Sequence, residues 1–275
     1  MQKINKLKHQ HITSFQIIIL GLLSVILLGS LFLMLPIATK DGQITPFSDA
    51  LFTATSAVCV TGLVIYDTAT YWSFFGQCII LLLIQIGGMG IVTIFVAVAV
   101  VSGQKIGLMQ RSTMQEAIAA PTINGIVRKT EFIIKTVVLI ELIGAAILAP
   151  VFCRDFGFLK GIWYSLFHSI SAFCNAGFDL MGIKEPFSSI TSYSTQPIVN
   201  MTIMALIIVG GIGFLTWEDI KNNKWNFKKY RMQSKVILSV TALLIVLPTL
   251  YFFFFEFSHL PVVERIWVSL FQAVT

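Results

Sequence analysis

The chain has 275 residues, of which 56% are hydrophobic and 12% are charged, and its mean hydropathy is +0.85. These values exclude a disordered chain and a water-soluble globular enzyme, and they are typical of an integral membrane protein. A crossing needs about 20 apolar residues, so the chain has room for roughly eight to ten crossings. The meaning of the net charge of +6 depends on where the basic residues lie.

The first apolar run, residues 15–36, follows a basic start that contains Lys3, Lys6 and Lys8. A signal peptide has a similar basic start, but this run is too long for one and no small-x-small cleavage site follows it. The sequence therefore predicts a transmembrane helix here.

Two kinds of apolar segment follow the first run. Segments of the first kind are long enough to span a bilayer, whereas those of the second kind are too short. The long segments are residues 74–101, 132–152, 197–215 and 236–255, and the short ones are 47–60 and 161–174, with a third short segment beginning before Thr275.

The basic residues predict an orientation in the membrane. Five crossings place residues 1–14, 102–131 and 216–235 on one side, and these segments together with Lys135 hold 14 of the 19 basic residues. Basic residues accumulate on the cytoplasmic side, so we expect a cytoplasmic amino terminus. This orientation requires both short segments to return to the side from which they enter.

The two short segments repeat each other. Residues 51–63 and 166–178 share Leu, Phe, Ser-Ala, Cys and Gly in register, and residues 267–275 open a third copy. The long segments that follow the two complete copies share Gly-Gly-x-Gly, at residues 87–90 and 210–213. A repeat of this kind indicates architecture. We therefore expect an all-α membrane fold of tandem units, each with an outer helix, a re-entrant half-helix, a short extended strand and an inner helix.

The repeat also predicts where units and loops divide the chain. The ranges are 1–14 for a cytoplasmic amino terminus, 15–101 and 132–215 for two complete units, 102–131 and 216–235 for cytoplasmic loops, and 236–275 for the start of a third unit. We expect Thr45 to cap the first half-helix with Pro46 in its first turn, and Pro261 to open the third. A half-helix from Phe47 to Ser56 rises roughly 15 Å and so ends near the middle of the membrane.

The stretches after the two half-helices, residues 59–62 and 174–177, carry the most specific chemistry. Non-helical backbone at this depth is tolerated only when it is buried in protein or lines an aqueous cavity. The carboxyl end of a half-helix is partially negative and favours a cation, and glycine permits the positive φ that turns successive carbonyls toward one axis. Rings of backbone carbonyls select potassium, and neither stretch contains an acid that could form a carboxylate ring instead.

Other candidate residues have more than one interpretation. We expect the glycines of the two inner helices to serve close helix packing. Glu141 lies in the middle of an apolar span, where an ionisable residue indicates either a functional site or a structural pair with a neighbouring helix. His168 is expected to orient or pack, because it stands alone. The four cysteines, Cys59, Cys78, Cys153 and Cys174, form no Cys-x-x-Cys pair, so we expect buried free thiols and no transition-metal site.

The repeated half-helix motifs, the Gly-Gly-x-Gly inner helices and the Trp-x-Ser-Leu-Phe sequence at residues 267–271 together resemble the Ktr/Trk/HKT superfamily of potassium transporters. The closest resemblance is to the membrane, pore-forming subunit of the bacterial Ktr potassium uptake system, over nearly the whole chain. It implies four units around one pore in the bacterial plasma membrane, a homodimer, and a cytoplasmic nucleotide-binding ring that regulates uptake. With two complete units and part of a third, the chain is expected to be a fragment truncated in the third pore helix.

The resemblance also assigns residues to the selectivity filter. It implies that K⁺ is bound largely by backbone carbonyls, with Gly62 and Gly177 as the first two filter glycines. The eight residues concerned are Cys59, Val60, Thr61, Gly62, Cys174, Asn175, Ala176 and Gly177.

Two other functions are weighed against this one. A secondary transporter, with Na⁺ as a coupling ion, also uses broken helices at the membrane midplane, but it predicts inverted repeats, whereas these units run in the same direction. A membrane-embedded enzyme needs paired titratable groups within the spans, and Glu141 alone does not supply them. Nothing indicates nucleic-acid binding, and membrane lipid accounts for the basic loops.

Overall fold

The computed structural model describes residues 13–90, 93, 113, 115, 126–183, 185–224 and 226–275. Within these ranges every regular element is a helix, apart from one isolated bridge between Thr39 and Trp72. Most of the expected cytoplasmic amino terminus at 1–14, and most of the expected loop at 102–131, lie outside the described residues.

The first unit contains three helices, α1 (Ser14–Leu33), α2 (Phe47–Val58) and α3 (Phe74–Met89). The short half-helix α2 packs against both longer helices. It begins at Phe47 as expected, but the prediction that Thr45 caps it is wrong. Pro46 is the N-cap residue and makes no side-chain capping bond, whereas the Thr45 hydroxyl lies 3.0 Å from that of Tyr71. Asp49 places a negative charge in the first turn instead, which stabilises the positive end of the helix dipole.

The second unit begins with a helical hairpin of α6 (Ile126–Phe156) and α7 (Phe158–Phe173). Both helices extend beyond the predicted segments, 132–152 and 161–174. Gly157, at a φ of 82°, makes the turn between them. The 16 residues of α7 give it a length of about 24 Å, so this helix is longer than half of an apolar core.

The inner helix of the second unit is broken near the carboxyl end of the segment predicted to cross the membrane, 197–215. The chain forms α8 (Pro197–Gly211) and α9 (Phe214–Asn223), whose axes differ by 97°. Gly213 has a φ of 82°, in the left-handed region that a continuing right-handed helix does not visit. In the first unit Gly90, at a φ of 79°, ends α3 in the same way, and residues 91, 92 and 94–101 of the predicted segment 74–101 lie outside the described residues.

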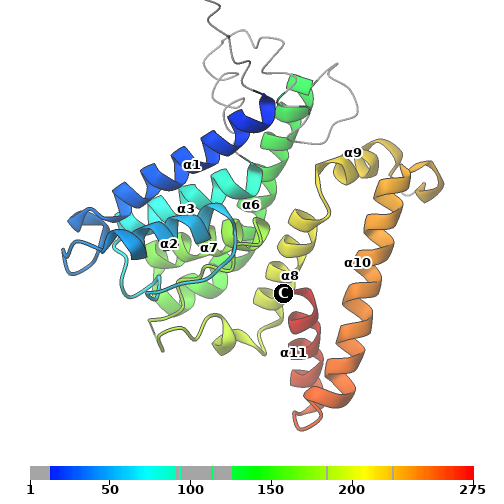
Figure 1. Ribbon diagram of the computed structural model, residues 1–275. Coiled ribbons are helices and arrows are strands. Elements are labelled where there is room, and N and C mark those ends of the chain that lie inside the picture. The colour runs from blue at the N-terminus through cyan, green and yellow to red at the C-terminus, as the bar shows by residue number, and fades with distance from the viewer. Residues whose placement is uncertain are drawn as a thin grey trace, which may run out of the picture.

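The third unit contains α10 (Met232–Tyr251), a π-helical segment (Phe252–Glu256) and α11 (Val262–Val274). Figure 1 shows α10 and α11 as an antiparallel hairpin, with α11 lying between α10 and α8. In the same view the amino-terminal ends of α1, α6 and α10 lie at one end of the molecule, as the predicted orientation requires.

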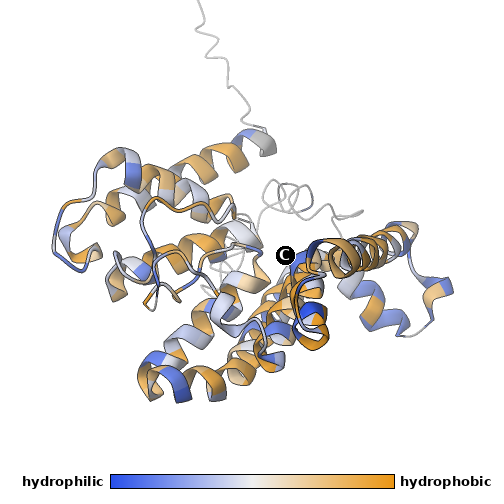
Figure 2. Ribbon diagram, turned by 90° about the horizontal axis from the view of Figure 1, so that it is seen from below, coloured by the Kyte–Doolittle hydropathy of each residue, from blue (hydrophilic) through white to orange (hydrophobic). Residues whose placement is uncertain are grey.

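Among the described residues, three helices are long and apolar enough to cross a membrane, namely α1, α6 and α10, and the bent pair α8 and α9 qualifies if it is counted as one span. The shorter helix α3 is also apolar. Figure 2 shows hydrophobic residues along most of these helices and polar residues at their ends and in the connections. Large apolar side chains stay exposed on the outer faces, among them Leu27 of α1, Leu139 of α6 and Leu244 of α10. Such faces suit contact with lipid and not with water.

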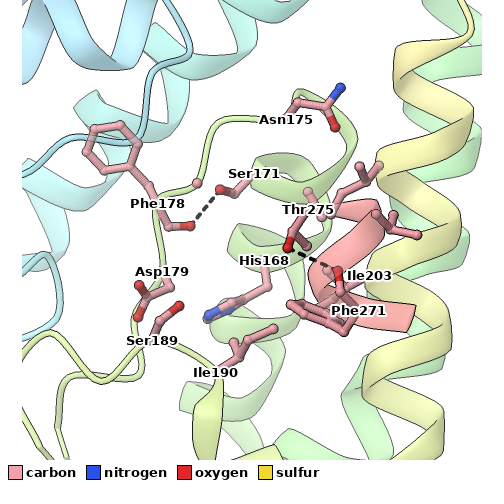
Figure 3. A pocket seen from close by; sticks show the side chains of 14 residues that line it. His168, Ser171, Asn175, Phe178, Asp179, Ser189, Ile190, Ile203, Phe271 and Thr275 are labelled. Atoms are coloured by element: carbon pink, nitrogen blue, oxygen red, sulfur yellow. Dashed lines mark hydrogen bonds between the residues drawn. The ribbon is translucent and has the colours of Figure 1, made fainter. Parts of the chain in front are cut away.

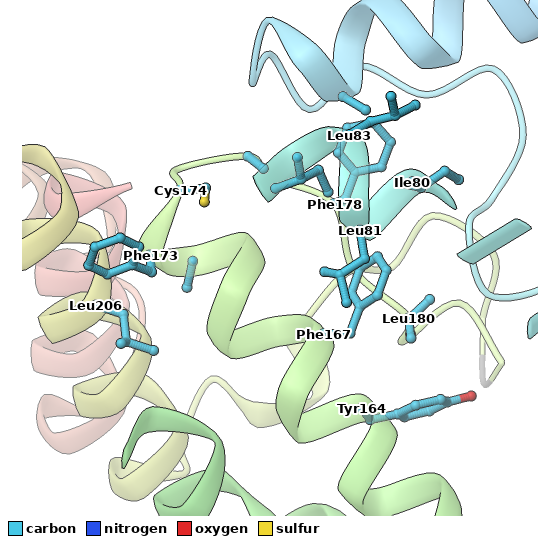
Figure 4. Close-up of a cluster of buried hydrophobic side chains, with 14 of the residues drawn as sticks. Ile80, Leu81, Leu83, Tyr164, Phe167, Phe173, Cys174, Phe178, Leu180 and Leu206 are labelled. Carbon is cyan, nitrogen blue, oxygen red and sulfur yellow. The ribbon is translucent and has the colours of Figure 1, made fainter. Parts of the chain in front are cut away.

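The buried core lies around α7, which packs against α3, α6 and α8. Figure 4 shows Phe167 of α7 beside Leu81 of α3 and Leu180 of the segment that follows α7. All three side chains are buried. The second half-helix is therefore fixed on several sides, and its carboxyl end has a defined position.

Candidate functional site

The two half-helices end with the same arrangement of backbone bonds. Cys59 donates to the Thr55 carbonyl at 2.8 Å, and Cys174 donates to the Ile170 carbonyl at 2.9 Å. Two residues further on, the Thr61 N–H bonds to the Ser56 carbonyl at 2.9 Å, and the Ala176 N–H to the Ser171 carbonyl at 2.8 Å. This is the Schellman closure of a helix, in which the residue after the cap adopts the left-handed conformation.

That left-handed position is occupied by Val60 in the first unit and by Asn175 in the second, each with a φ of 57°. Glycine usually fills it, and asparagine is the next most tolerant residue. A β-branched valine is strained in this conformation by about 1–2 kcal/mol. The packing of α2 must therefore hold Val60 in place.

The expected filter glycines lie next to each other. Gly62 has a φ of 76° and Gly177 a φ of 72°, which confirms the prediction that both need a positive φ. A Cβ on Gly62 would lie 2.7 Å from the Ala176 carbonyl oxygen and 3.1 Å from the Gly177 Cα. The two segments thus meet backbone to backbone, with no room for a side chain between them.

The carboxyl ends of the half-helices pack against glycines of the inner helices. A Cβ on Gly87 of α3 would collide with the Val58 carbonyl at the end of α2, and a Cβ on Gly210 of α8 would collide with the Phe173 carbonyl at the end of α7. The packing prediction is therefore confirmed for these two. Gly88 also packs closely, against Cys174.

The prediction of packing is wrong for the last glycine of each motif. Gly90 and Gly213 both have positive φ, and no atom of a described residue lies within 4 Å of a Cβ built on either. Their role is to end or break the helix. The expectation of buried cysteines also needs correction, because only Cys174 is buried and Cys59 is exposed at the cap of α2.

Side chains of α7 hold the segment that follows Gly177. The Ser171 hydroxyl donates to the Phe178 carbonyl at 2.5 Å, as Figure 3 shows, and the Leu180 N–H donates to Nε2 of His168 at 3.3 Å. Because Nε2 accepts, Nδ1 carries the proton and donates to the Tyr164 carbonyl at 2.7 Å. His168 is therefore a neutral orienting residue, as expected.

In the first unit, different side chains make hydrogen bonds that hold the segment around Gly62. The Thr61 hydroxyl donates to Oγ of Ser56 at 2.8 Å, and the Tyr66 hydroxyl donates to Oδ2 of Asp49 at 2.6 Å. This hydrogen bond, together with desolvation and the negative charge of Asp49, raises the pKa of Tyr66 to about 12. Sequence reasoning overlooked these contacts, although Ser56 and Ser171 recur in register and could have indicated them.

A cavity of about 520 Å³ opens beside residues 174–177. Its walls come from α7, α8, α11 and the segment after Gly177, and they include His168, Asn175, Asp179 and Phe271. Figure 3 shows that Phe271 of α11 and Thr275, which follows this helix, line the cavity together with His168. The third unit therefore contributes to the same space as the second.

Glu141 is buried in α6, and its partner is Gln85 of α3, which sequence reasoning could not identify. Nε2 of Gln85 donates to Oε1 of Glu141 at 2.9 Å. The Ser169 hydroxyl of α7 donates to the Glu141 backbone carbonyl at 2.6 Å. Three helices are joined at this residue.

The structure is thus a helical membrane fold in which the ends of two half-helices meet through glycine backbone. The chain matches the family model TrkH, described as cation transport protein, over residues 3–274. The chain belongs to the TrkH family.

Curated relatives agree with this membership. The chain is 40% identical over 280 residues to the potassium/sodium uptake protein NtpJ of Enterococcus hirae, and 40% identical over 283 residues to the Ktr system potassium uptake protein B of Bacillus subtilis. Both alignments cover 100% of this chain and 61% of the relative. Identity to the Ktr system potassium uptake protein B of Vibrio alginolyticus is 34% over 247 residues, covering 90% of this chain and 52% of that protein. The chain thus spans about three fifths or less of the length of these relatives.

Proposed function

We propose that the protein is the pore-forming subunit for potassium uptake across the bacterial plasma membrane. Dehydrated K⁺ is selected by the backbone carbonyls of the filter segments, residues 59–62 and 174–177. The observation that carries the proposal is the direct approach of Gly62 and Gly177 at the ends of two half-helices.

Electrostatics supports a cation at this place. The carboxyl ends of α2 and α7 direct the negative ends of two helix dipoles toward the meeting point of the segments. Neither segment contains a charged side chain, so backbone carbonyls are the ligands available there. Potassium suits such a site, because carbonyl oxygens replace the hydration shell of a weakly hydrated ion.

The names of the relatives support the choice of ion. Two are named as potassium uptake proteins of a Ktr system, and a third as a potassium/sodium uptake protein. K⁺ is therefore the proposed transported ion and Na⁺ a possible coupling ion. A sodium-coupled secondary transporter is the second candidate, since the 97° break between α8 and α9 gives the broken helix that such transporters use.

Partners and topology follow from the same resemblance. We propose a homodimer that works with a cytoplasmic nucleotide-binding ring, since the relatives are named as parts of a Ktr system. The five crossings and the cytoplasmic loop 216–235 belong to this proposal. In the structure, residues of that loop form ion pairs between Arg231 and both Glu218 and Asp219, which fix the turn between α9 and α10.

The test is a flux assay on the full-length protein in vesicles, with Gly62→Ser and Gly177→Ser as variants. Each substitution forces a side chain between the two segments, so discrimination of K⁺ over Na⁺ should fall. Gly42→Ser is the matched control, because Gly42 also has a positive φ, 68°, but nothing lies within 4 Å of its Cβ position. If both filter variants kept the selectivity and the uptake rate of the wild type, the assignment of these segments as a selectivity filter would be wrong.

A further inference from the structure

Glu141 is a carboxyl group in an apolar place. It lies within the part of α6 that is long and apolar enough to span a membrane, and only 4% of its surface is exposed. In the part of the chain that the structure describes, its carboxyl group receives one hydrogen bond, from Nε2 of Gln85, and no basic side chain pairs with it. An ionised carboxylate with this single partner would be costly, because one hydrogen bond from an amide does not replace its hydration.

The side chain of Gln85 has an acceptor atom that lacks a donor among the described residues. Its Oε1 atom is buried and accepts no hydrogen bond from any described residue. A buried acceptor without a donor is uncommon in folded proteins, and each case calls for an explanation. A protonated carboxyl group supplies the explanation, because it gains one O–H donor that an ionised carboxylate lacks.

We propose that Glu141 is neutral in the folded protein and that its protonated oxygen donates to Oε1 of Gln85. The carboxyl group and the amide then form two hydrogen bonds in opposite directions, one from Gln85 to Glu141 and one from Glu141 to Gln85. Neither group keeps an unmet donor or acceptor at this contact. This pairing goes beyond the proposed function, since it does not depend on which ion is carried.

The position of the pair gives it a structural role in the site. Gln85 precedes Gly87 and Gly88 on α3, the two glycines that receive the ends of both half-helices at Val58 and Cys174. Glu141 is also fixed to α7, because Ser169 donates to its backbone carbonyl. The pair therefore acts as a positioning element, which holds the inner helix of the first unit against the outer helix of the second behind the filter segments.

Infrared difference spectroscopy of the full-length protein in lipid vesicles at neutral pH tests the protonation directly. The wild-type spectrum minus that of Glu141→Gln should contain the carbonyl stretching band of a protonated carboxylic acid. Glu256→Gln, which removes an exposed glutamate, is the control and should remove carboxylate bands instead. Carboxylate bands in the Glu141→Gln difference spectrum would overturn the proposal.

A set of variants tests the pairing. Glu141→Gln keeps two complementary hydrogen bonds, so its unfolding temperature should stay near that of the wild type. The exchanged variant Gln85→Glu/Glu141→Gln should do the same and should keep ion uptake within about twofold. Glu141→Leu, which leaves the Gln85 amide unmatched, should lower both quantities. If Glu141→Gln were as damaging as Glu141→Leu, the charge would be required and the neutral pair would be wrong.

Discussion

The Asp67 carboxylate of the first unit accepts a hydrogen bond of 3.0 Å from the backbone N–H of Phe187 in the second unit. Its other oxygen accepts two bonds of 2.9 Å, from the N–H and the hydroxyl of Thr70. Gly182 packs directly on the same carboxylate, where any side chain would collide with it. The segments that follow the two filter stretches are thus connected through one buried acid.

Asp67→Asn should loosen this connection. An amide replaces one acceptor oxygen by an NH₂ group, which then faces a backbone or side-chain donor, and the loss should be about 1–3 kcal/mol in the free energy of unfolding. Chemical unfolding in detergent micelles, followed by tryptophan fluorescence, measures it. Asp41→Asn is the control, since Asp41 is exposed, and it should have no effect. If the two variants were equally stable, the hydrogen bonds of Asp67 would contribute nothing measurable to the free energy of unfolding.

Alanine at Gly87 or Gly210 should destabilise the protein by similar amounts. In both cases a methyl group would meet a backbone carbonyl, of Val58 or Phe173, which cannot move without displacing a half-helix. Overpacking of this kind costs about 1–3 kcal/mol. Gly211→Ala offers a close comparison, because the nearest atom to its Cβ would be the Asn175 amide nitrogen at 3.5 Å, an ordinary contact. A thermal unfolding series in detergent should separate the first two variants from the third.

His168→Ala should weaken the attachment of the segment that follows Gly177. It leaves the Leu180 N–H without its acceptor, which costs about 1–3 kcal/mol for a buried donor. Ser171→Ala removes the neighbouring bond to Phe178, and the double variant should show coupling, since both bonds hold one short segment. Uptake of K⁺ and Na⁺ by proteoliposomes gives the readout, with exposed His259→Ala as control. Unchanged selectivity in the double variant would assign the two bonds to folding alone.

Tyr66 should lose its hydroxyl proton at a higher pH than an ordinary tyrosine does. Its pKa is about 12, against an ordinary value near 10, mainly because its hydroxyl donates to Asp49. A raised pKa means that the folded protein binds this proton more tightly than the unfolded chain does. The stabilisation is therefore fully present below about pH 10 and is lost as the pH rises through about 12.

Tyrosinate absorbance, measured as the difference between the wild type and Tyr66→Phe, isolates this group. In an Asp49→Asn background the same difference should move toward an ordinary tyrosine pKa, because the carboxylate acceptor and its charge are gone. A curve that does not move would show that Asp49 is not the cause.

The sequence predicted the parts of the fold that depend on local pattern. The repeat located both half-helices, and the glycines at 62 and 177 predicted the positive φ that the structure has. Apolar character continues across residues 211–213, so a hydropathy pattern could not show the break at Gly213, which depends on backbone conformation.

The sequence could not predict contacts between residues that lie far apart in the chain. Thr45 looks like a helix cap, but the Tyr71 hydroxyl engages it from another part of the chain. Gln85 of α3 pairs with Glu141 of α6 only because the fold brings these two helices together, and no spacing rule relates the two positions. Lys160 separates Phe158 and Leu159 from the apolar segment predicted at 161–174, so the hydropathy pattern did not show that α7 begins at Phe158.

The closure of the two half-helices has a consequence for how such a site can evolve. Each closure is built from N–H and carbonyl groups alone, so Val60 and Asn175 reach the same φ of 57° with unrelated side chains. Two units built this way can keep the same backbone geometry while their side chains differ. Only the glycine, which has no side chain to vary, must stay the same in every copy.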